Sequence, residues 1–123
     1  MVTENHVNID LAKLLKYKGF NETTDYIYYY YEEDDDYCFE RLLPEDKFIE
    51  DKMVRCPSLQ MTLKWLREVH HIFVQIELYD KYEDYVYEIF QNTHRLMIEN
   101  RQCFSTPEEA AESAIEYCLE NLI

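Results

Sequence analysis

The chain has 123 residues, of which 47% are apolar and 15% aromatic, and its 26 acidic and 12 basic side chains give a formal net charge of −14. This composition predicts a single domain over 1–123 with a buried core, and it excludes a chain that is disordered throughout. The acidic field disfavours direct binding to nucleic acid or to an anionic membrane surface, and no apolar run reaches the roughly 20 residues that span a bilayer.

A helix is predicted at residues 8–18. Asn8 can cap its first turn, Asp10 lies near the positive end of the helix dipole, and apolar residues recur on one face. Gly19 is the only glycine, and it stands where a left-handed residue often ends a helix. Phe20 can then supply the hydrophobic contact of a Schellman turn.

The segment DYIYYYYEEDDDYCF, at residues 25–39, holds seven aromatic and six acidic side chains. The aromatic content of Tyr26 to Tyr31 predicts a strand, the acidic residues 32–36 suit a solvated turn, and Tyr37 to Phe39 can pair back. Alternation puts Tyr26, Tyr28 and Tyr30 on one face, and Ile27, Tyr29 and Tyr31 on the other. Both faces are amphipathic, so the pattern does not indicate which one is buried.

Residues 40–55 show no pattern that assigns an element firmly. From Pro57 a helix is predicted that ends at His70-His71, because apolar residues recur at helical spacing. The expected inner face is Leu59, Thr62, Leu63, Leu66 and Val69, with Met61 and Trp65 on the flank.

Alternation over 72–79 predicts a strand with Ile72, Val74, Ile76 and Leu78 on one face. Asp80 to Asp84 suit a polar turn, and a second strand is predicted at Tyr85 to Phe90. After a turn at Asn92-Thr93, a third strand is predicted at Arg95 to Glu99.

The last helix has the strongest signature. Thr106 and Glu109 have the spacing of a capping box, and Pro107 occupies the first helical position. The predicted fold class is therefore α+β. An N-terminal helix and a Tyr-rich hairpin lie in residues 1–55, and residues 57–123 form an α-β-β-β-α core with a three-stranded antiparallel meander.

The order α-β-β-β-α resembles the topology of double-stranded-RNA-binding domains. Those domains contact phosphates through basic residues at the start of the last helix, whereas this helix begins with Pro107-Glu108-Glu109. The carboxylates would repel the ligand, so the resemblance implies topology without RNA binding.

A second resemblance covers most of the chain. The segments LAKLLKYKGF, SLQMTLKWLREVHHI and FSTPEEAAESAIEYCLENLI, with the motifs W-L-R-E-x-H and T-x-E-E-A, resemble a group of small acidic proteins of unassigned function. That group occurs in Bacteroidetes-type bacteria and their phages or mobile elements. Its motifs specify a fold and imply no catalytic residue and no cofactor.

Candidate chemical sites are few. His70 and His71 could bind a metal or act as a base, but imidazoles also favour a helix C-terminus, and no ligand spacing accompanies them. Asp34, Asp35 and Asp36 lack the spacing of a calcium loop. Trp65 could stack on a ligand but is expected to pack in the core. We therefore predict no catalytic, cofactor or metal site.

The four cysteines form no C-x-x-C pair, and no secretory signal precedes them. Free, mostly buried thiols in a cytoplasmic protein are therefore expected, rather than disulfides.

For function, the sequence favours a non-enzymatic accessory protein that binds another protein. The expected partner surface is Tyr26, Tyr28, Tyr30, Glu32, Glu33, Asp34, Asp35 and Asp36. Tyrosines are enriched at interfaces, and the backbone of Tyr26 to Tyr31 could pair with a second copy to form a homodimer. The alternatives are an acidic DNA mimic that inhibits a nucleic-acid-binding protein, and an uncharacterised small enzyme.

Overall fold

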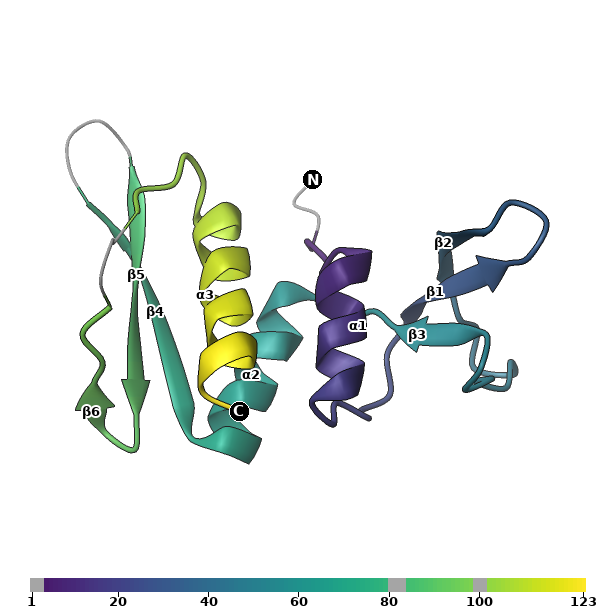
Figure 1. Cartoon of the computed structure of the whole chain (residues 1–123), viewed down its shortest axis with the longest axis horizontal. Coiled ribbons are helices and arrows are strands. Elements are labelled where there is room, and N and C mark those ends of the chain that lie inside the picture. Colours follow the sequence, from purple (N-terminus) through teal and green to yellow (C-terminus); the bar gives the residue numbers. More distant parts are fainter. Residues whose placement is uncertain (1–3, 80–83, 99–101) are drawn as a thin grey trace. The chain divides into compact units, whose positions relative to one another are not determined.

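The computed structural model describes residues 4–79, 84–98 and 102–123. Within them the chain is α+β, as predicted, with three helices and two three-stranded antiparallel sheets. The chain forms two compact units, Met1–Ser58 and Leu59–Ile123, and each sheet belongs to one of them (Figure 1). The boundary falls close to the one expected between residues 55 and 57, while the prediction of a single domain over 1–123 stays a prediction.

The first unit begins with helix α1 (Ile9–Tyr17), and both of its predicted ends are confirmed. The side chain of Asn8 accepts a hydrogen bond from the amide of Leu11 at 2.8 Å. Gly19 has φ +97°, its amide donates to the carbonyl of Lys16, and the amide of Phe20 donates to that of Leu15. This pair of bonds defines the Schellman turn.

The first sheet has the strand order β2-β1-β3, and its hairpin was predicted. Strand β1 (Tyr26–Tyr31) pairs with β2 (Asp36–Arg41), and Tyr28 stands opposite Phe39. The turn is shorter than expected, because Asp36 already pairs with Tyr31 as part of β2.

Strand β3 (Met53–Arg55) lies in the segment that the sequence left unassigned, and it pairs with the other edge of β1. The amide of Tyr30 donates to the carbonyl of Lys52, and the amide of Cys56 donates to that of Tyr26. The expectation that the Tyr26 to Tyr31 backbone is free to pair with a second copy is therefore wrong. β1 is the central strand of the sheet.

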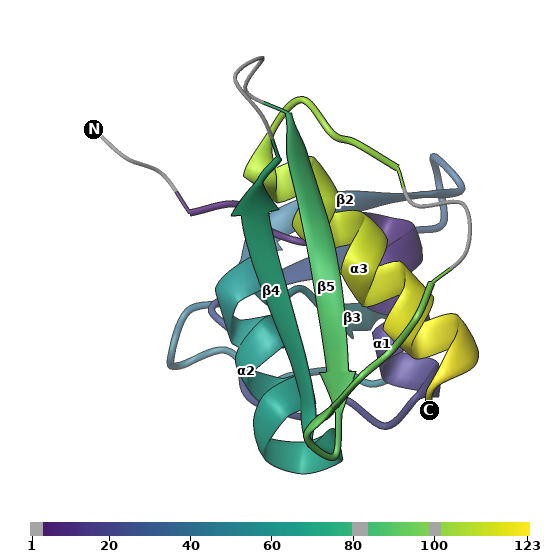
Figure 2. The same cartoon turned by 90° about the vertical axis from the view of Figure 1, so that its left-hand side faces the viewer.

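The second unit has the element order α2 (Leu59–His70), β4 (Ile72–Leu78), β5 (Tyr85–Gln91), β6 (His94–Arg95) and α3 (Pro107–Asn121). Its strands form an antiparallel meander, and both helices pack on one face of it (Figures 1 and 2). The element order of the whole chain differs from the predicted one, since β3 stands between the hairpin and α2. The likeness to double-stranded-RNA-binding domains stays a prediction.

Three details of the second unit differ from expectation. Pro57 lies before α2 and is not part of it. Trp65 is buried, which confirms that it packs in the core, but Val69, expected on the inner face, is 52% exposed, so the inner face of α2 is rotated toward Trp65. Strand β6 covers only His94–Arg95, and Glu99, its expected end, lies outside the described residues. Most of the turn at Asp80 to Asp84 also lies outside them.

Helix α3 and the turn before β6 follow the prediction. The hydroxyl of Thr106 accepts a hydrogen bond from the amide of Glu109 at 3.1 Å, and Pro107 begins the helix. Asn92 and Thr93 both have positive φ, at 51° and 69°, which is the geometry of a type I′ hairpin turn. The inner face of α3 is fully packed by Ala110, Ala111, Ala114, Ile115, Cys118 and Leu119.

Candidate functional site

The acidic end of the β1-β2 hairpin is the exposed part of the expected partner surface. Its five carboxylate residues, which we call the acidic tip, are all exposed: Glu32, Glu33, Asp34, Asp35 and Asp36. The backbone supports this turn, because the amides of Asp34 and Asp35 donate to the carbonyls of Tyr31 and Glu32. The tip is thus held on a paired hairpin.

The three tyrosines expected on this surface are each half-buried and have different roles. The hydroxyl of Tyr28 donates to the carbonyl of Val7 at 2.7 Å, and burial, followed by the nearby Cys56, raises the pKa of this phenol. Tyr26 stacks on Phe39 at 4.9 Å between ring centroids and meets the edge of His6 at 4.7 Å. Tyr26 and Tyr28 therefore pack within the first unit.

Tyr30 lies next to the acidic tip. Its hydroxyl donates to the carboxylate of Asp35, and this hydrogen bond is the main reason why its pKa is raised. Its ring contacts Tyr37 at 5.2 Å, and the ammonium group of Lys13 lies 4.6 Å from the Tyr37 ring centroid. Tyr30 and Tyr37 form an aromatic base beneath the tip.

The opposite face of the hairpin carries residues that the sequence did not single out. The rings of Tyr29 and Tyr31 are 4.8 Å apart, and the hydroxyl of Tyr31 donates to Glu40. That hydrogen bond, more than any other cause, raises the pKa of Tyr31 to about 12. Cys38 is exposed on the same face. The alternation groups Tyr29 with Tyr31, but only the observed pairing shows that Glu40 joins them.

The charge of the acidic tip is barely compensated. Lys52 lies 3.4 Å from Glu32, and both side chains are largely exposed. Among the described residues no ion pair reaches Glu33, Asp34 or Asp36. An exposed ion pair of this kind contributes at most about 1 kcal/mol, so the tip presents a negative field to solvent.

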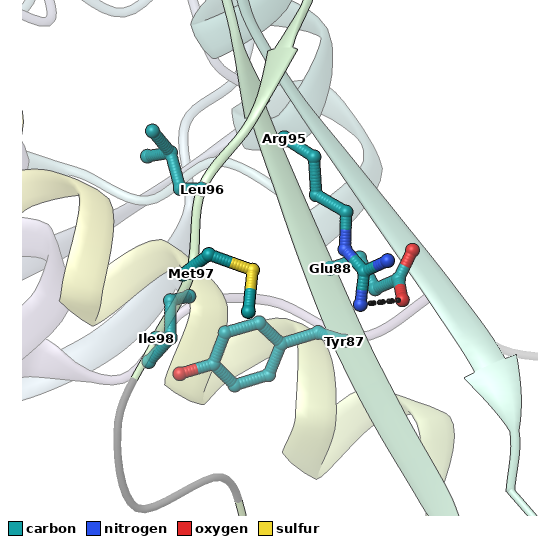
Figure 3. Close-up of a pocket in the computed structure, with 6 residues that line it drawn as sticks. All are labelled: Tyr87, Glu88, Arg95, Leu96, Met97 and Ile98. Carbon is teal, nitrogen blue, oxygen red and sulfur yellow. Dashed lines mark ion pairs between the residues drawn. The ribbon is translucent and has the colours of Figure 1, made fainter.

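The second unit holds a small apolar pocket of about 160 Å³ beside β5 and β6. Figure 3 shows the side chains of Tyr87, Met97 and Ile98 close together on one side of it. On the other side, Arg95 and Glu88 form an ion pair at 3.1 Å. Ligand pockets usually measure roughly 300–1,000 Å³, so this one suits a single side chain or a few atoms.

A shallower hollow of about 280 Å³ lies next to α3 and shares Tyr87 and Ile98 with the first pocket. Its other lining residues are Gln102, Ser113, Glu116, Tyr117 and Glu120. The two pockets contain no cysteine or histidine and no paired nucleophile and base, so their described lining does not indicate a reaction.

The remaining candidates do not converge on a site. His70 is half-buried against Trp65, with ring centroids 4.7 Å apart, and its buried Nε2 atom has no hydrogen-bond partner among the described residues. Burial, and secondarily His71, lowers the pKa of His70. The described residues contain no group of three or more metal-ligating side chains, Asp34, Asp35 and Asp36 included.

All four cysteines are free thiols. Cys56 and Cys118 are buried, whereas Cys38 and Cys103 are exposed, so the expectation of mostly buried thiols holds for half of them. Burial raises the pKa of Cys56 to about 11 and that of Cys118 to about 12. Neither buried thiol is activated as a nucleophile.

Comparisons with family models, with curated proteins and with solved structures found no match for this chain. The resemblance to small acidic bacterial and phage proteins therefore stays a prediction. Within the described residues, no helix has both the length and the apolar character needed to cross a membrane.

Proposed function

We propose that this chain is a non-enzymatic accessory protein that acts in the cytoplasm by binding another protein. The binding element is the β1-β2 hairpin, with the acidic tip and Tyr30 at its centre. The observation that supports this most directly is a run of five exposed carboxylates, held on a paired hairpin above two tyrosine rings. The partners would be an unidentified basic protein and a second copy of the chain.

The physical basis is the combination of charge and aromatic area. Complementary charges raise the rate of encounter and select a basic surface, while tyrosine rings supply contact area at low entropic cost. Because exposed charges are screened beyond about 8 Å at physiological salt, such binding weakens as salt rises. As part of the same proposal, the protein belongs with the small acidic proteins that it resembles, from bacteria and their mobile elements.

The test compares two variants with equal charge change. Glu33→Gln/Asp34→Asn/Asp36→Asn removes three of the five negative charges of the tip, and Glu108→Gln/Glu116→Gln/Glu120→Gln removes three exposed negative charges from α3. Each is used with the parent protein to capture partners from a lysate of the native host at low and high salt. The tip variant is expected to lose the salt-sensitive partner and the α3 variant to retain it. Equal capture by all three proteins would contradict the assignment of the tip.

DNA mimicry is the second candidate, because exposed carboxylates lie on both units, at the tip and along α3. It requires the protein to compete with DNA for a basic groove. Competition against a DNA duplex for purified nucleases and repressors at low salt distinguishes the two functions. A mimic would lose potency in both charge variants, whereas the proposed protein binder loses its partner only in the tip variant.

A further inference from the structure

The outer edge of β2 is an open strand edge. In the sheet order β2-β1-β3, β2 pairs on one side only, and no described residue pairs with its other side. Phe39 lies in the middle of this edge and is 48% exposed although its ring stacks on Tyr26. An open edge that carries a large apolar side chain is a template for another strand.

The direction of the free backbone groups follows from one hydrogen bond. The amide of Leu42 donates to the carbonyl of Asp25, so the backbone N–H and C=O groups of Leu42 point toward β1. Because backbone groups alternate along an antiparallel strand, Cys38 and Glu40 also point toward β1. The backbone groups of Tyr37, Phe39 and Arg41 therefore point away from β1, toward the open edge. The amide of Tyr37 already donates a hydrogen bond to the side chain of Asp36.

Symmetry restricts how two copies of β2 can pair. When the two-fold axis is perpendicular to the sheet, each side chain lies on the same face as the side chain directly opposite it. One residue must therefore stand opposite its own copy, and the axis passes between these two copies. Two such registers keep most of β2 in the ladder, with Cys38 opposite Cys38 or with Phe39 opposite Phe39. The first places Asp36 opposite Glu40, and like charges directly opposite each other are destabilising.

The second register has no such conflict. Phe39 meets Phe39 of the second copy, and Arg41 stands opposite the ring of Tyr37. These are an aromatic pair and a cation-aromatic pair, and both favour association. We propose that two copies of this chain pair antiparallel along β2, with Phe39 at the two-fold axis. The inference rests on the proposed role of the hairpin as the binding element, and it identifies the edge, the register and one partner.

Disulfide trapping tests the register. In the Phe39 register, Cys38 faces Glu40 of the second copy at a non-hydrogen-bonded position, where Cα atoms are about 4.5 Å apart and a disulfide can form. In a Cys103→Ser background, Glu40→Cys is expected to give a covalent dimer under mild oxidation. The Cys103→Ser protein alone is expected to stay monomeric on a non-reducing gel. If that control protein cross-links through Cys38, the other register exists and the proposal is wrong.

Sizing by analytical ultracentrifugation tests the backbone ladder. Phe39→Pro removes the ring and one outward amide, whose loss an edge strand tolerates, whereas Phe39→Ala removes the ring and retains the amide. The proline is expected to weaken the dimer at least about tenfold beyond the alanine. The parent dimer should strengthen between low salt and about 0.5 M salt, where repulsion between acidic copies is screened within about 4 Å.

Two results would overturn the inference. One is a monomer at every concentration and salt together with no trapped dimer, which would leave the edge to a strand of another protein. The other is an equal dimer in the parent and proline proteins. If the proline variant fails to fold, the trapping result decides alone. Partner capture by the tip variant is measured separately, so failure of the dimer and failure of the proposed function are distinguishable.

Discussion

Removal of the Tyr28 hydroxyl tests how the first unit is held together. Tyr28→Phe deletes the donor to the carbonyl of Val7, at 2.7 Å, and leaves that carbonyl with the Cys56 thiol, 3.4 Å away, as its donor. A lost hydrogen bond costs roughly 0.5–1.5 kcal/mol, and an undersatisfied buried acceptor adds to it, so we expect about 1.5 kcal/mol. For a unit of this size that corresponds to a fall in Tm of about 6–12 °C.

The same variant predicts a change in pH dependence. The pKa of Tyr28 is raised above its ordinary value of 10.0 in the folded protein, so the unfolded chain loses the phenol proton first as pH rises. The contribution of this phenol to the free energy of unfolding is complete below pH 10 and is lost as pH rises toward the pKa in the folded protein. Tyr28→Phe should therefore lose less stability at alkaline pH than the parent protein does.

Amide hydrogen exchange across residues 26–31 and 36–41 is the suitable assay, because it reports on the hairpin directly. Trp65, the only tryptophan, lies in the other unit. The matched control is Tyr29→Phe, on the opposite face of β1, with no hydrogen bond from its hydroxyl to a described residue. Unchanged exchange in Tyr28→Phe, or the same alkaline loss as in the parent protein, would refute the reasoning.

Two further predictions concern the second unit and can be followed by Trp65 fluorescence in urea. Thr93 has φ +69° beside Asn92, and a β-branched residue there costs about 1–2 kcal/mol, so Thr93→Gly should stabilise by about 0.5–1 kcal/mol after the entropy of glycine is subtracted. Thr93→Ala should raise the free energy of unfolding by less than Thr93→Gly does. An equal increase in the two variants would show that Thr93 is not strained. The lowered pKa of His70 means that the unfolded chain binds its proton first as pH falls below about 6.5, so stability is lost on acidification. His70→Phe should remove this loss, whereas His71→Asn, which takes away only the secondary cause of the lowered pKa, should reduce it less.

The helix ends could be predicted because their signals are local. Asn8 and Gly19 bracket α1, and Thr106 with Pro107 begins α3, each through a hydrogen bond or a backbone preference within a few residues. The confirmed α+β class follows from these signals and from the alternation in β4. Such patterns depend little on the rest of the chain.

Strand β3 could not be predicted for the opposite reason. It has only three residues, too few to show alternation, and its partner β1 lies more than twenty residues earlier in the chain. The register of Tyr28 with Val54 is fixed by tertiary packing, which burial of Met53 and Val54 accompanies. Sequence periodicity contains no record of such a long-range pair.

The position of Val69 shows a similar limit within a helix. Trp65 and Val69 are both apolar and lie one turn apart, so spacing alone admits either edge of the stripe as the inner one. The larger ring gains more from burial, and α2 is rotated accordingly, which leaves Val69 exposed. The half-buried ring of His70 packs against Trp65, although His70 was expected only to end the helix.

The pairing of β3 with β1 decides which parts of the hairpin are open to a partner. If β1 were an edge strand, its six aromatic and aliphatic residues could pair with a strand of another chain. With β3 in place, both backbone sides of β1 are paired, and the hydroxyls of Tyr28, Tyr30 and Tyr31 bind acceptors within the unit. Tyr28 and Tyr31 thus serve chiefly to hold the hairpin, while the half-buried ring of Tyr30 also lies beside the acidic tip. The acidic tip and the β2 edge are the parts of the hairpin that remain open to partners. The tip offers charged contacts to a basic protein, and the β2 edge offers backbone hydrogen bonds to a second copy of the chain.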